Sequence, residues 1–140
     1  FIVATGRGDF PNQVNNSICF PGILKGALAV RARKISDGMA IRCAHSLADF
    51  AKARGINPDN IVPNMDESDV FSVEAADVAE QAVKEGLARV PKSREEVYAW
   101  AKKEIAAARK TFESMMERGD IPQPEEAMIL AARDWALTQV

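Results

Sequence analysis

The chain opens with the sequence FIVATGRGDFPNQVNN, residues 1–16. Its first four residues predict a buried strand, Phe1–Ala4, because aromatic and β-branched side chains suit a pleated, buried surface. Gly6 and Gly8 follow, and glycine permits backbone angles that other residues avoid. Three asparagines and one glutamine then lie within five positions, a dense set of neutral hydrogen-bond donors and acceptors. The pattern therefore predicts a strand, a ligand-binding loop and then a helix.

Beyond this loop the sequence favours helices, and no second strand is convincing. Apolar residues recur at helical spacing, and serines or prolines precede most of these tracts. We expect helices over residues 23–33, from Ser36-Asp37 to about Gly55, over residues 73–88 after Ser72, over residues 94–118 after a Ser93–Glu96 capping box, and from Pro124 onward. The predicted fold is mainly α, with one N-terminal strand followed by about five helices. On the last helix, the expected buried face consists of Met128, Ala131, Ala132 and Trp135.

Composition excludes several classes of protein. The 140 residues are 47% hydrophobic and 27% charged, as in an ordinary soluble domain. The net charge of −2 argues against a nucleic-acid partner, and no apolar run of about 18 residues predicts a membrane span. The chain begins without methionine, which suggests a piece of a longer or processed protein. We expect Cys19 and Cys43 to be small buried thiols in a reducing compartment, rather than a disulfide or a metal pair.

The opening run also resembles a known signature, which lies late in the nucleotide-binding domain of bacterial and archaeal malic enzymes. Two positions depart from the family pattern: Gly8 stands for a serine and Phe10 for a tyrosine, and neither change removes an amide. The resemblance is specific to about Arg33 and extends more weakly to Arg89. It rests on the segments Ala4–Arg7, Gly8–Pro11, Asn12–Asn16, Phe20-Pro21 and Gly26–Leu28. The weaker part includes Asn60–Pro63, which lies in a stretch, residues 57–72, that the sequence predicts to be a solvated surface loop.

The resemblance implies that residues 1–140 are the C-terminal portion of a Rossmann-type NAD(P)-binding domain. We expect three parts: strand, amide loop and helix (1–33), a helical region (34–91) and a C-terminal helical extension (92–140). The glycine-rich phosphate turn Gly-x-Gly-x-x-Gly is absent from the sequence. The family's catalytic acid, catalytic base and metal ligands lie upstream of the signature, so we expect neither catalytic nor metal-binding residues here.

The family's activity is the oxidative decarboxylation of L-malate to pyruvate and CO2, with reduction of NAD or NADP and with Mg²⁺ or Mn²⁺ as the metal. The expected partners are malate or pyruvate, the remainder of the enzyme chain and a second copy in a homodimer. A cytoplasmic location is expected, and these residues alone should be inactive. Cofactor preference stays open, because the residue that reads the ribose 2′ position would lie upstream.

The resemblance assigns substrate contact to Asn15 and Asn16, without deciding which of them lies closer to malate. Gly6, Arg7 and Asn12 are the candidates for cofactor binding, either directly or by shaping the loop. Neutral amides suit such a site, because they donate to carboxylate and hydroxyl oxygens without adding charge. A helix cap is the structural alternative for the asparagine pair, since asparagine is a favoured cap.

Two other functions stay open. The first is a non-catalytic interaction domain that dimerises through an apolar seam on the longest helix. The second is another NAD(P)-dependent dehydrogenase that shares only the strand and the loop. The seam consists of Val97, Ala101, Ile105, Ala108, Phe112 and Met115, which recur at heptad-like spacing.

Overall fold

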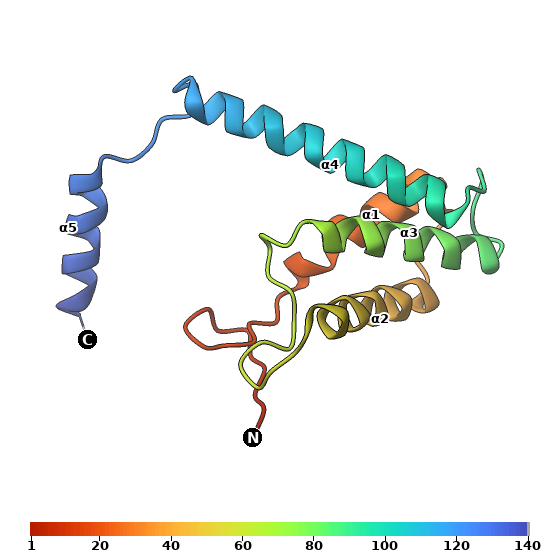
Figure 1. Ribbon diagram of the computed structural model, residues 1–140, viewed down its shortest axis with the longest axis horizontal. Helices are drawn as coiled ribbons and strands as arrows, with labels where there is room; N and C mark the ends of the chain where they lie inside the picture. Colours follow the sequence, from red (N-terminus) through yellow and green to blue (C-terminus); the bar gives the residue numbers. More distant parts are fainter. Residues whose placement is uncertain (140) are drawn as a thin grey trace. The chain divides into compact units, whose positions relative to one another are not determined.

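The computed structural model describes residues 1–139, and its regular structure is helical (Figure 1). A short 3₁₀ helix, η1 (Asn16–Ile18), precedes α1 (Phe20–Ala29), α2 (Asp37–Arg54), α3 (Asp69–Lys84), α4 (Arg94–Glu117) and α5 (Glu126–Leu137). The prediction of a mainly α chain with about five helices is confirmed. The chain forms two compact units, residues 1–105 and the described residues from Ala106 on. No helix among residues 1–139 has both the length and the apolarity needed to cross a membrane.

The predicted N-terminal strand is absent from the part of the chain that the structure describes. Phe1, Ile2 and Val3 are exposed, and the one nearby ladder contact is an isolated bridge between Thr5 and Gln13. A strand needs a neighbour for its backbone N–H and C=O groups, and residues 1–139 supply none. The apolar run therefore keeps its β-forming composition without forming a sheet.

Helix α3 is the centre of the first unit, and both α1 and α2 pack against it (Figure 1). Small side chains make close packing possible. A Cβ atom at Gly26 of α1 would lie 2.5 Å from the carbonyl oxygen of Ala75 in α3, so the backbones of the two helices lie close together there. The start of α4 completes the core with Val97 and Ala101. The other members of the core are Ile23, Ala29, Val30, Met39, Cys43, Ala75, Val78, Ala79 and Ala82.

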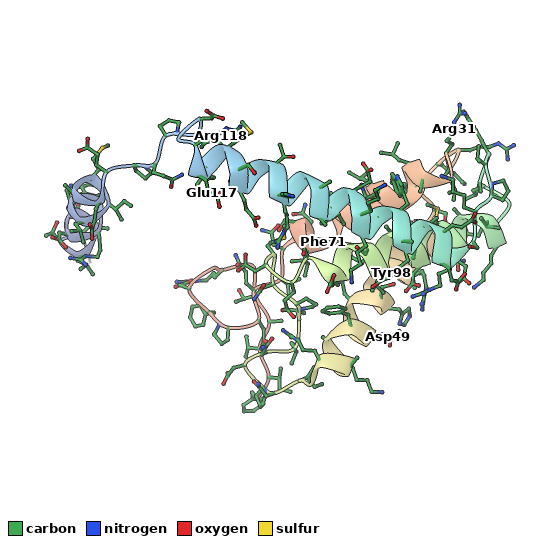
Figure 2. The ribbon with its side chains drawn as sticks, turned by 45° about the horizontal axis from the view of Figure 1, so that its top comes forward. Arg31, Asp49, Phe71, Tyr98, Glu117 and Arg118 are labelled. Carbon is green, nitrogen blue, oxygen red and sulfur yellow. The ribbon has the colours of Figure 1, made fainter. Side chains whose placement is uncertain are left out.

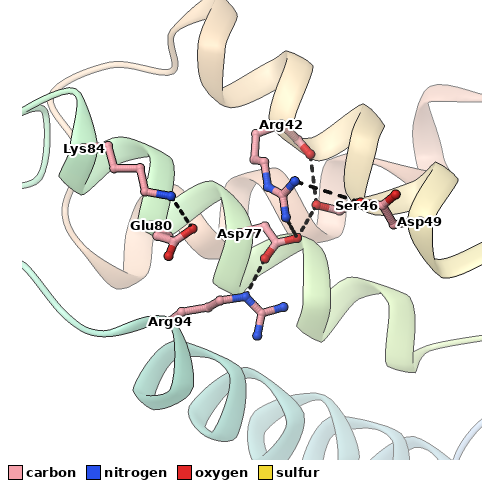
Figure 3. Close-up of polar contacts among 7 residues, drawn as sticks. All are labelled: Arg42, Ser46, Asp49, Asp77, Glu80, Lys84 and Arg94. Atoms are coloured by element: carbon pink, nitrogen blue, oxygen red, sulfur yellow. Dashed lines mark hydrogen bonds and ion pairs between the residues drawn. The ribbon is translucent and has the colours of Figure 1, made fainter.

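A buried carboxylate joins three of these helices (Figure 3). The Asp77 side chain of α3 is 2% exposed. Its Oδ2 atom accepts hydrogen bonds from Ser46 Oγ at 2.6 Å and Arg42 Nη2 at 2.8 Å, both on α2. Its Oδ1 atom accepts from Arg94 Nε at 2.7 Å, and this bond raises the pKa of the Arg94 guanidinium. The network fixes how α2, α3 and the start of α4 are assembled.

Helix boundaries test the sequence predictions directly. Ser36 caps α2 and Gly55 follows its end, as expected. Ser93 and Glu96 form the predicted capping box, with bonds of 2.8 and 3.2 Å between side chain and main chain. Helix α1 ends four residues early, because Arg31 adopts a positive φ of 51° in the turn after it (Figure 2).

The predicted start of α3 is wrong. The helix begins at Asp69, and Ser72, expected as its cap, lies inside it with 1% exposure. The N-cap position belongs to Ser68 instead. Phe71 explains the earlier start, because this buried side chain lies in the first turn and helps to anchor it (Figure 2).

The second unit consists of the later part of α4 and of α5. The face of α5 predicted to be buried is exposed in this chain, and none of the helix's residues is buried. In the seam predicted on α4, Phe112 is likewise exposed, at 55%. Val97 and Ala101 of the same seam lie in the core of the first unit. For the part of the chain that the structure describes, the prediction of a buried face on α5 is therefore wrong, because no described residue covers it. The α5 face consists of Met128, Ala131, Ala132 and Trp135.

Candidate functional site

Asn12 ties the amide loop to a distant segment of the chain. Its Nδ2 atom donates to the carbonyl oxygens of Val3 at 3.0 Å and Pro58 at 2.7 Å. Its Oδ1 atom accepts from the N–H of Ile61 at 2.8 Å. The residue is buried and has a φ of 55°, a left-handed conformation that asparagine tolerates better than most residues. The Asn12 carboxamide is therefore committed to main-chain groups and shapes the loop.

Asn15 has a different role at the end of the loop. Its backbone is extended, and its Oδ1 atom accepts from the N–H of Ser17 at 2.9 Å, so the side chain caps η1. Within residues 1–139 its Nδ2 group has no hydrogen-bond partner, and the side chain is exposed. The capping alternative thus holds for the oxygen of Asn15, and two N–H donors stay available.

Asn16 is the first residue of η1, and its side chain is exposed. Its main-chain oxygen accepts from the N–H of Cys19 at 3.1 Å, but its carboxamide bonds to none of the described residues. Asn15 and Asn16 therefore both carry amide donors that none of the described residues uses, but of the two only Asn15 lines a hollow of the structure. Such donors can bind carboxylate, hydroxyl or amide oxygens of a ligand.

Gly6 and Arg7 lie at the exposed tip of the loop. Arg7 forms an ion pair with Asp9, with Nε 2.8 Å from Oδ1, and its guanidinium carbon lies 4.9 Å from the centre of the Phe10 ring. The Arg7 guanidinium holds the pKa of the Asp9 carboxyl below its ordinary value. Because both side chains are well exposed, this pair adds little to stability. It does fix the direction in which the Arg7 charge points.

A hollow of about 280 Å³ lies between the amide loop and the segment that Asn12 holds against it. Amides dominate its polar lining, and its one charged group is the carboxylate of Asp59. The lining residues are Asn12, Gln13, Asn15, Ser17, Ile18, Asp59, Asn60, Val62, Pro63, Asn64 and Met65. The hollow therefore offers neutral amide donors and acceptors beside one carboxylate, and no cationic side chain of residues 1–139 lines it.

The sequence analysis missed the second wall of this hollow, residues 58–65, which it treated as part of a surface loop. Arg54 holds this segment in place: Nη2 donates to Asn60 Oδ1 at 2.6 Å and Nη1 pairs with Glu67 at 2.6 Å. Asn60-Ile61-Val62-Pro63 was the one signal available, as a short motif within the weaker part of the resemblance. Its contact with the loop depends on bonds to Asn12 across 46 and 49 residues, which no local pattern indicates.

The hollow does not fit a divalent metal ion. Magnesium and manganese prefer several oxygen ligands, and Asp59 is the single carboxylate in the lining. Among the described residues, the one group of three or more side chains close enough to share a metal is Cys19, Cys43 and Glu74, which lies elsewhere and carries two sulfur ligands. The residues that line this hollow therefore do not form a binding site for the metal of the reaction.

Comparison with known proteins identifies the family. A family model described as "Malic enzyme, NAD binding domain" matches residues 2–83, more than half of the chain. The chain belongs to the malic enzyme family. The malic enzyme family includes NAD-dependent and NADP-dependent oxidoreductases among the relatives of this chain. The family assignment of the opening run is thereby confirmed.

Solved malic enzymes have the same fold. The crystal structure of the Entamoeba histolytica malic enzyme matches 99% of this chain at 52% identity with a TM-score of 0.96, and this chain covers 29% of it. The malic enzyme from Pyrococcus horikoshii matches 84% at 40% identity with a TM-score of 0.77, and 27% of that chain is covered. The "Bifunctional malic/malolactic enzyme" of Bacillus subtilis is 41% identical over 96 residues, which are 69% of this chain and 23% of that protein. The chain thus spans about a quarter of the length of these relatives.

Proposed function

We propose that the chain is the C-terminal part of the NAD(P)-binding domain of a malic enzyme, with the divisions 1–33, 34–91 and 92–140. The intact enzyme would oxidise L-malate with NAD or NADP and decarboxylate the product to pyruvate and CO2. The observation that carries the proposal is the family match together with the unused amide donors of Asn15 and Asn16. A cytoplasmic location belongs to the same proposal.

Asn15 and Asn16 would contact malate and the nicotinamide side of the cofactor. A dry active site makes each amide donor effective, and losing one such contact costs about 1–3 kcal/mol. Because the oxygen of Asn15 accepts the bond of the cap, only the N–H donors of its side chain remain for a ligand. Such donors match the carboxylate and hydroxyl oxygens of malate. The hollow lacks a cation, so charge neutralisation of the dicarboxylate would come from the rest of the enzyme and its metal.

Gly6, Arg7 and Asn12 would act on the cofactor side by setting the shape of the loop. Asn12 does so through its three main-chain bonds, and Gly6 leaves the tip free of side-chain bulk. Arg7 is the one group of the three with a charge for a cofactor phosphate, and its pairing with Asp9 would have to open for that contact.

Mg²⁺ or Mn²⁺ would be held by residues outside this chain. When bound, the metal polarises the hydroxyl and carbonyl oxygens of the substrate. The contribution of this chain is then binding and orientation by neutral groups, which do not disturb the charges of an acid, a base or a metal nearby.

Exposed apolar side chains in both units support the proposal that further protein covers them in the intact enzyme. In the first unit the exposed side chains include Phe1, Ile2, Val3 and Leu28, and in the second they include Trp135. We assign the N-terminal group to the rest of the domain, where residues 1–4 would find the neighbouring strand they lack. The α5 group would face a second copy of the enzyme in a homodimer.

The direct test is kinetic. In the intact enzyme, Asn15→Ala and Asn16→Ala should each lower malate-dependent reduction of the cofactor by about tenfold or more, the equivalent of 1–3 kcal/mol. Gln123→Ala, which removes an exposed carboxamide from the second unit, is the matched control and should leave the rate unchanged. Wild-type kinetics in both loop variants would overturn the assignment.

A second variant separates ligand binding from capping. Asn15→Ser keeps a side-chain oxygen that can cap η1, because serine is also a favoured N-cap, but it removes the amide donor. If Asn15 only caps, Asn15→Ser should restore the activity lost in Asn15→Ala. Under our proposal the serine variant stays as impaired as the alanine variant while its thermal stability returns to wild type.

The alternatives make different predictions. A dehydrogenase sharing only the loop would turn over without a divalent metal and release no CO2. The dimerisation domain built on the Val97–Met115 seam loses support, because Val97 and Ala101 are buried in the core of the first unit. Self-association through that seam would therefore require the core to open.

A further inference from the structure

Three helices bring two cysteines and a glutamate together in the first unit. Cys19 immediately precedes α1, Cys43 lies within α2 and Glu74 lies within α3. The two sulfur atoms are 2.8 Å apart, and the three potential ligand atoms all lie within 4.8 Å of one another. Sequence spacing did not reveal this cluster, because the residues are 24 and 31 positions apart.

Glu74 is the unexplained member of the cluster. Its side chain is fully buried, and neither carboxylate oxygen has a hydrogen-bond partner among residues 1–139. Asp77, one turn further along α3, instead receives bonds from Arg42, Ser46 and Arg94. A buried carboxylate without a donor or a cation is costly, so Glu74 must either keep its proton or face a positive charge.

The helix packing makes room for this arrangement. A Cβ atom at Gly22 in the first turn of α1 would overlap the Glu74 side chain, so glycine there leaves space for the carboxylate. Cys43 is buried with Glu74, whereas Cys19 is partly exposed. The cluster is therefore enclosed on the side of α2 and α3 and accessible from the side of Cys19.

We propose that Cys19, Cys43 and Glu74 bind a thiophilic divalent cation of the Zn²⁺ class. Thiolates with one carboxylate are ligands that Zn²⁺ accepts, whereas Mg²⁺ and Ca²⁺ avoid sulfur. The cation would be the positively charged partner that the buried Glu74 carboxylate does not have among residues 1–139. Three protein ligands leave a fourth position of a tetrahedral ion for water or an external ligand on the exposed side of Cys19.

Binding requires a small movement and the loss of protons. Two sulfurs on one tetrahedral zinc stand about 3.7 Å apart, given Zn–S bonds of about 2.3 Å. The thiols must therefore separate by about 1 Å from their present 2.8 Å. Each Zn–S bond forms as a thiol gives its proton to water, and the Glu74 carboxyl likewise loses its proton. No electron is transferred, and affinity should rise with pH.

Formation of a disulfide between the two cysteines is the rival interpretation. Two thiols and one molecule of hydrogen peroxide would give a disulfide and two molecules of water. This reaction uses the proximity of the sulfurs, but it leaves the buried carboxylate unpaired. The metal site accounts for both observations, and the Glu74 variant distinguishes the two interpretations.

The experiment uses the intact enzyme, stripped of metal and kept reduced, with Co²⁺ as the spectroscopic probe and Zn²⁺ as the competitor. Thiolate ligation gives a near-ultraviolet charge-transfer band, and tetrahedral Co²⁺ gives visible d–d bands. Other cysteines of the intact enzyme can also bind cobalt, so the signal is the difference between wild type and Cys43→Ser. We expect one Co²⁺ per chain in that difference, displaced by one Zn²⁺.

Glu74→Gln should weaken Co²⁺ and Zn²⁺ binding by about tenfold or more, since loss of even an outer partner of a metal ligand costs about 10- to 100-fold. Glu80→Gln is the matched control, because it makes the same change at a half-buried position of α3, paired with Lys84 outside the cluster, and should leave affinity unchanged. If Cys43→Ser fails to fold by circular dichroism, Cys19→Ala at the partly exposed position carries the test.

Two results would overturn the proposal. One is a cobalt spectrum that is the same in wild type, in the folded cysteine variant and in Glu74→Gln. The other is a Cys19–Cys43 disulfide, found by mass spectrometry of the enzyme without reductant, together with Zn²⁺ affinity that Glu74→Gln does not change.

Discussion

Helices α3 and α5 differ in burial far more than in composition. Helix α3 buries ten of its sixteen residues, whereas α5 buries none of its twelve, although α5 is the more apolar of the two. The difference lies in their neighbours: α1 and α2 pack against α3, and no described element of the second unit covers α5. Substitutions in α3 should therefore change the unfolding of this chain strongly, and substitutions in α5 should affect association instead.

The largest expected effect in α3 concerns Glu74. Burial raises the pKa of its carboxyl to about 8, from an ordinary 4.5. The folded state therefore prefers the protonated form, so this stability is complete below about pH 4.5 and is lost as the pH rises through about 8. In the metal-free enzyme, raising the pH from 5 to 9 should cost on the order of 4 kcal/mol of unfolding free energy from this group.

Urea denaturation at both pH values measures this loss. Glu74→Gln carries no charge at this position and should show a much smaller drop between pH 5 and pH 9. Glu80→Gln, at a half-buried position of α3 outside the cluster, should show the same drop as wild type. Parallel pH dependence in wild type and Glu74→Gln would mean that the buried carboxyl does not titrate in this range.

Asp77→Ala should be the next most damaging change. It leaves the buried Ser46 hydroxyl and two guanidinium groups without their common acceptor. Because Arg42 and Arg94 are 36% and 38% exposed, water replaces part of what they lose. We expect a loss of about 2–4 kcal/mol in unfolding free energy, measured by urea titration. Asp77→Asn keeps one acceptor and should lose less, and equal losses in the two variants would argue against the network.

Gly26→Ala tests the close contact between α1 and α3. The new methyl group would meet the Ala75 carbonyl oxygen, which is main chain and cannot rotate away. Overpacking of this kind costs about 1–3 kcal/mol, and it outweighs the gain in helix propensity of about 1 kcal/mol from replacing glycine. A thermal melt of the variant measures the sum. Wild-type or higher stability would show that the helices can separate at no cost.

The smallest effect on unfolding is expected in α5. Trp135→Ala removes an exposed side chain and should change the unfolding free energy of the monomer by less than about 0.5 kcal/mol. If α5 faces a second copy, as we propose, the same change should weaken dimerisation by tenfold or more in sedimentation equilibrium. Arg133→Ala, at a neighbouring exposed position, is the control. An unchanged dimer would place the interface elsewhere.

The sequence predicted best those features that depend on neighbouring residues. The Ser36 cap, the Gly55 terminus and the Ser93–Glu96 box each involve groups within four positions of one another, and all three are present. The prediction of where α3 starts was wrong, because Ser68 and Ser72 are both reasonable N-caps by local rules. Burial of Phe71 decided between them, and that contact depends on the tertiary fold.

The candidate site divides in the same way. The cap that Asn15 forms with Ser17 is local, and the sequence offered it as an alternative. The bonds of Asn12 to the Pro58 carbonyl and the Ile61 N–H, and the meeting of Cys19 with Cys43, join segments far apart in the chain. The strand was expected from composition, but strand formation also requires a partner, which these residues do not include.

The Asn12 carboxamide has a consequence for any attempt to transplant this loop. One side chain binds Val3, Pro58 and Ile61 at once, so the loop and the 58–61 turn behave as a single mechanical part. A chimaera that exchanged residues 5–16 between relatives would keep these bonds only where the recipient places its own main chain at residues 3, 58 and 61 in the same positions. Engineering of this region should therefore exchange the loop and the 58–61 turn together. Replacement of Asn12 alone should leave the loop less well ordered.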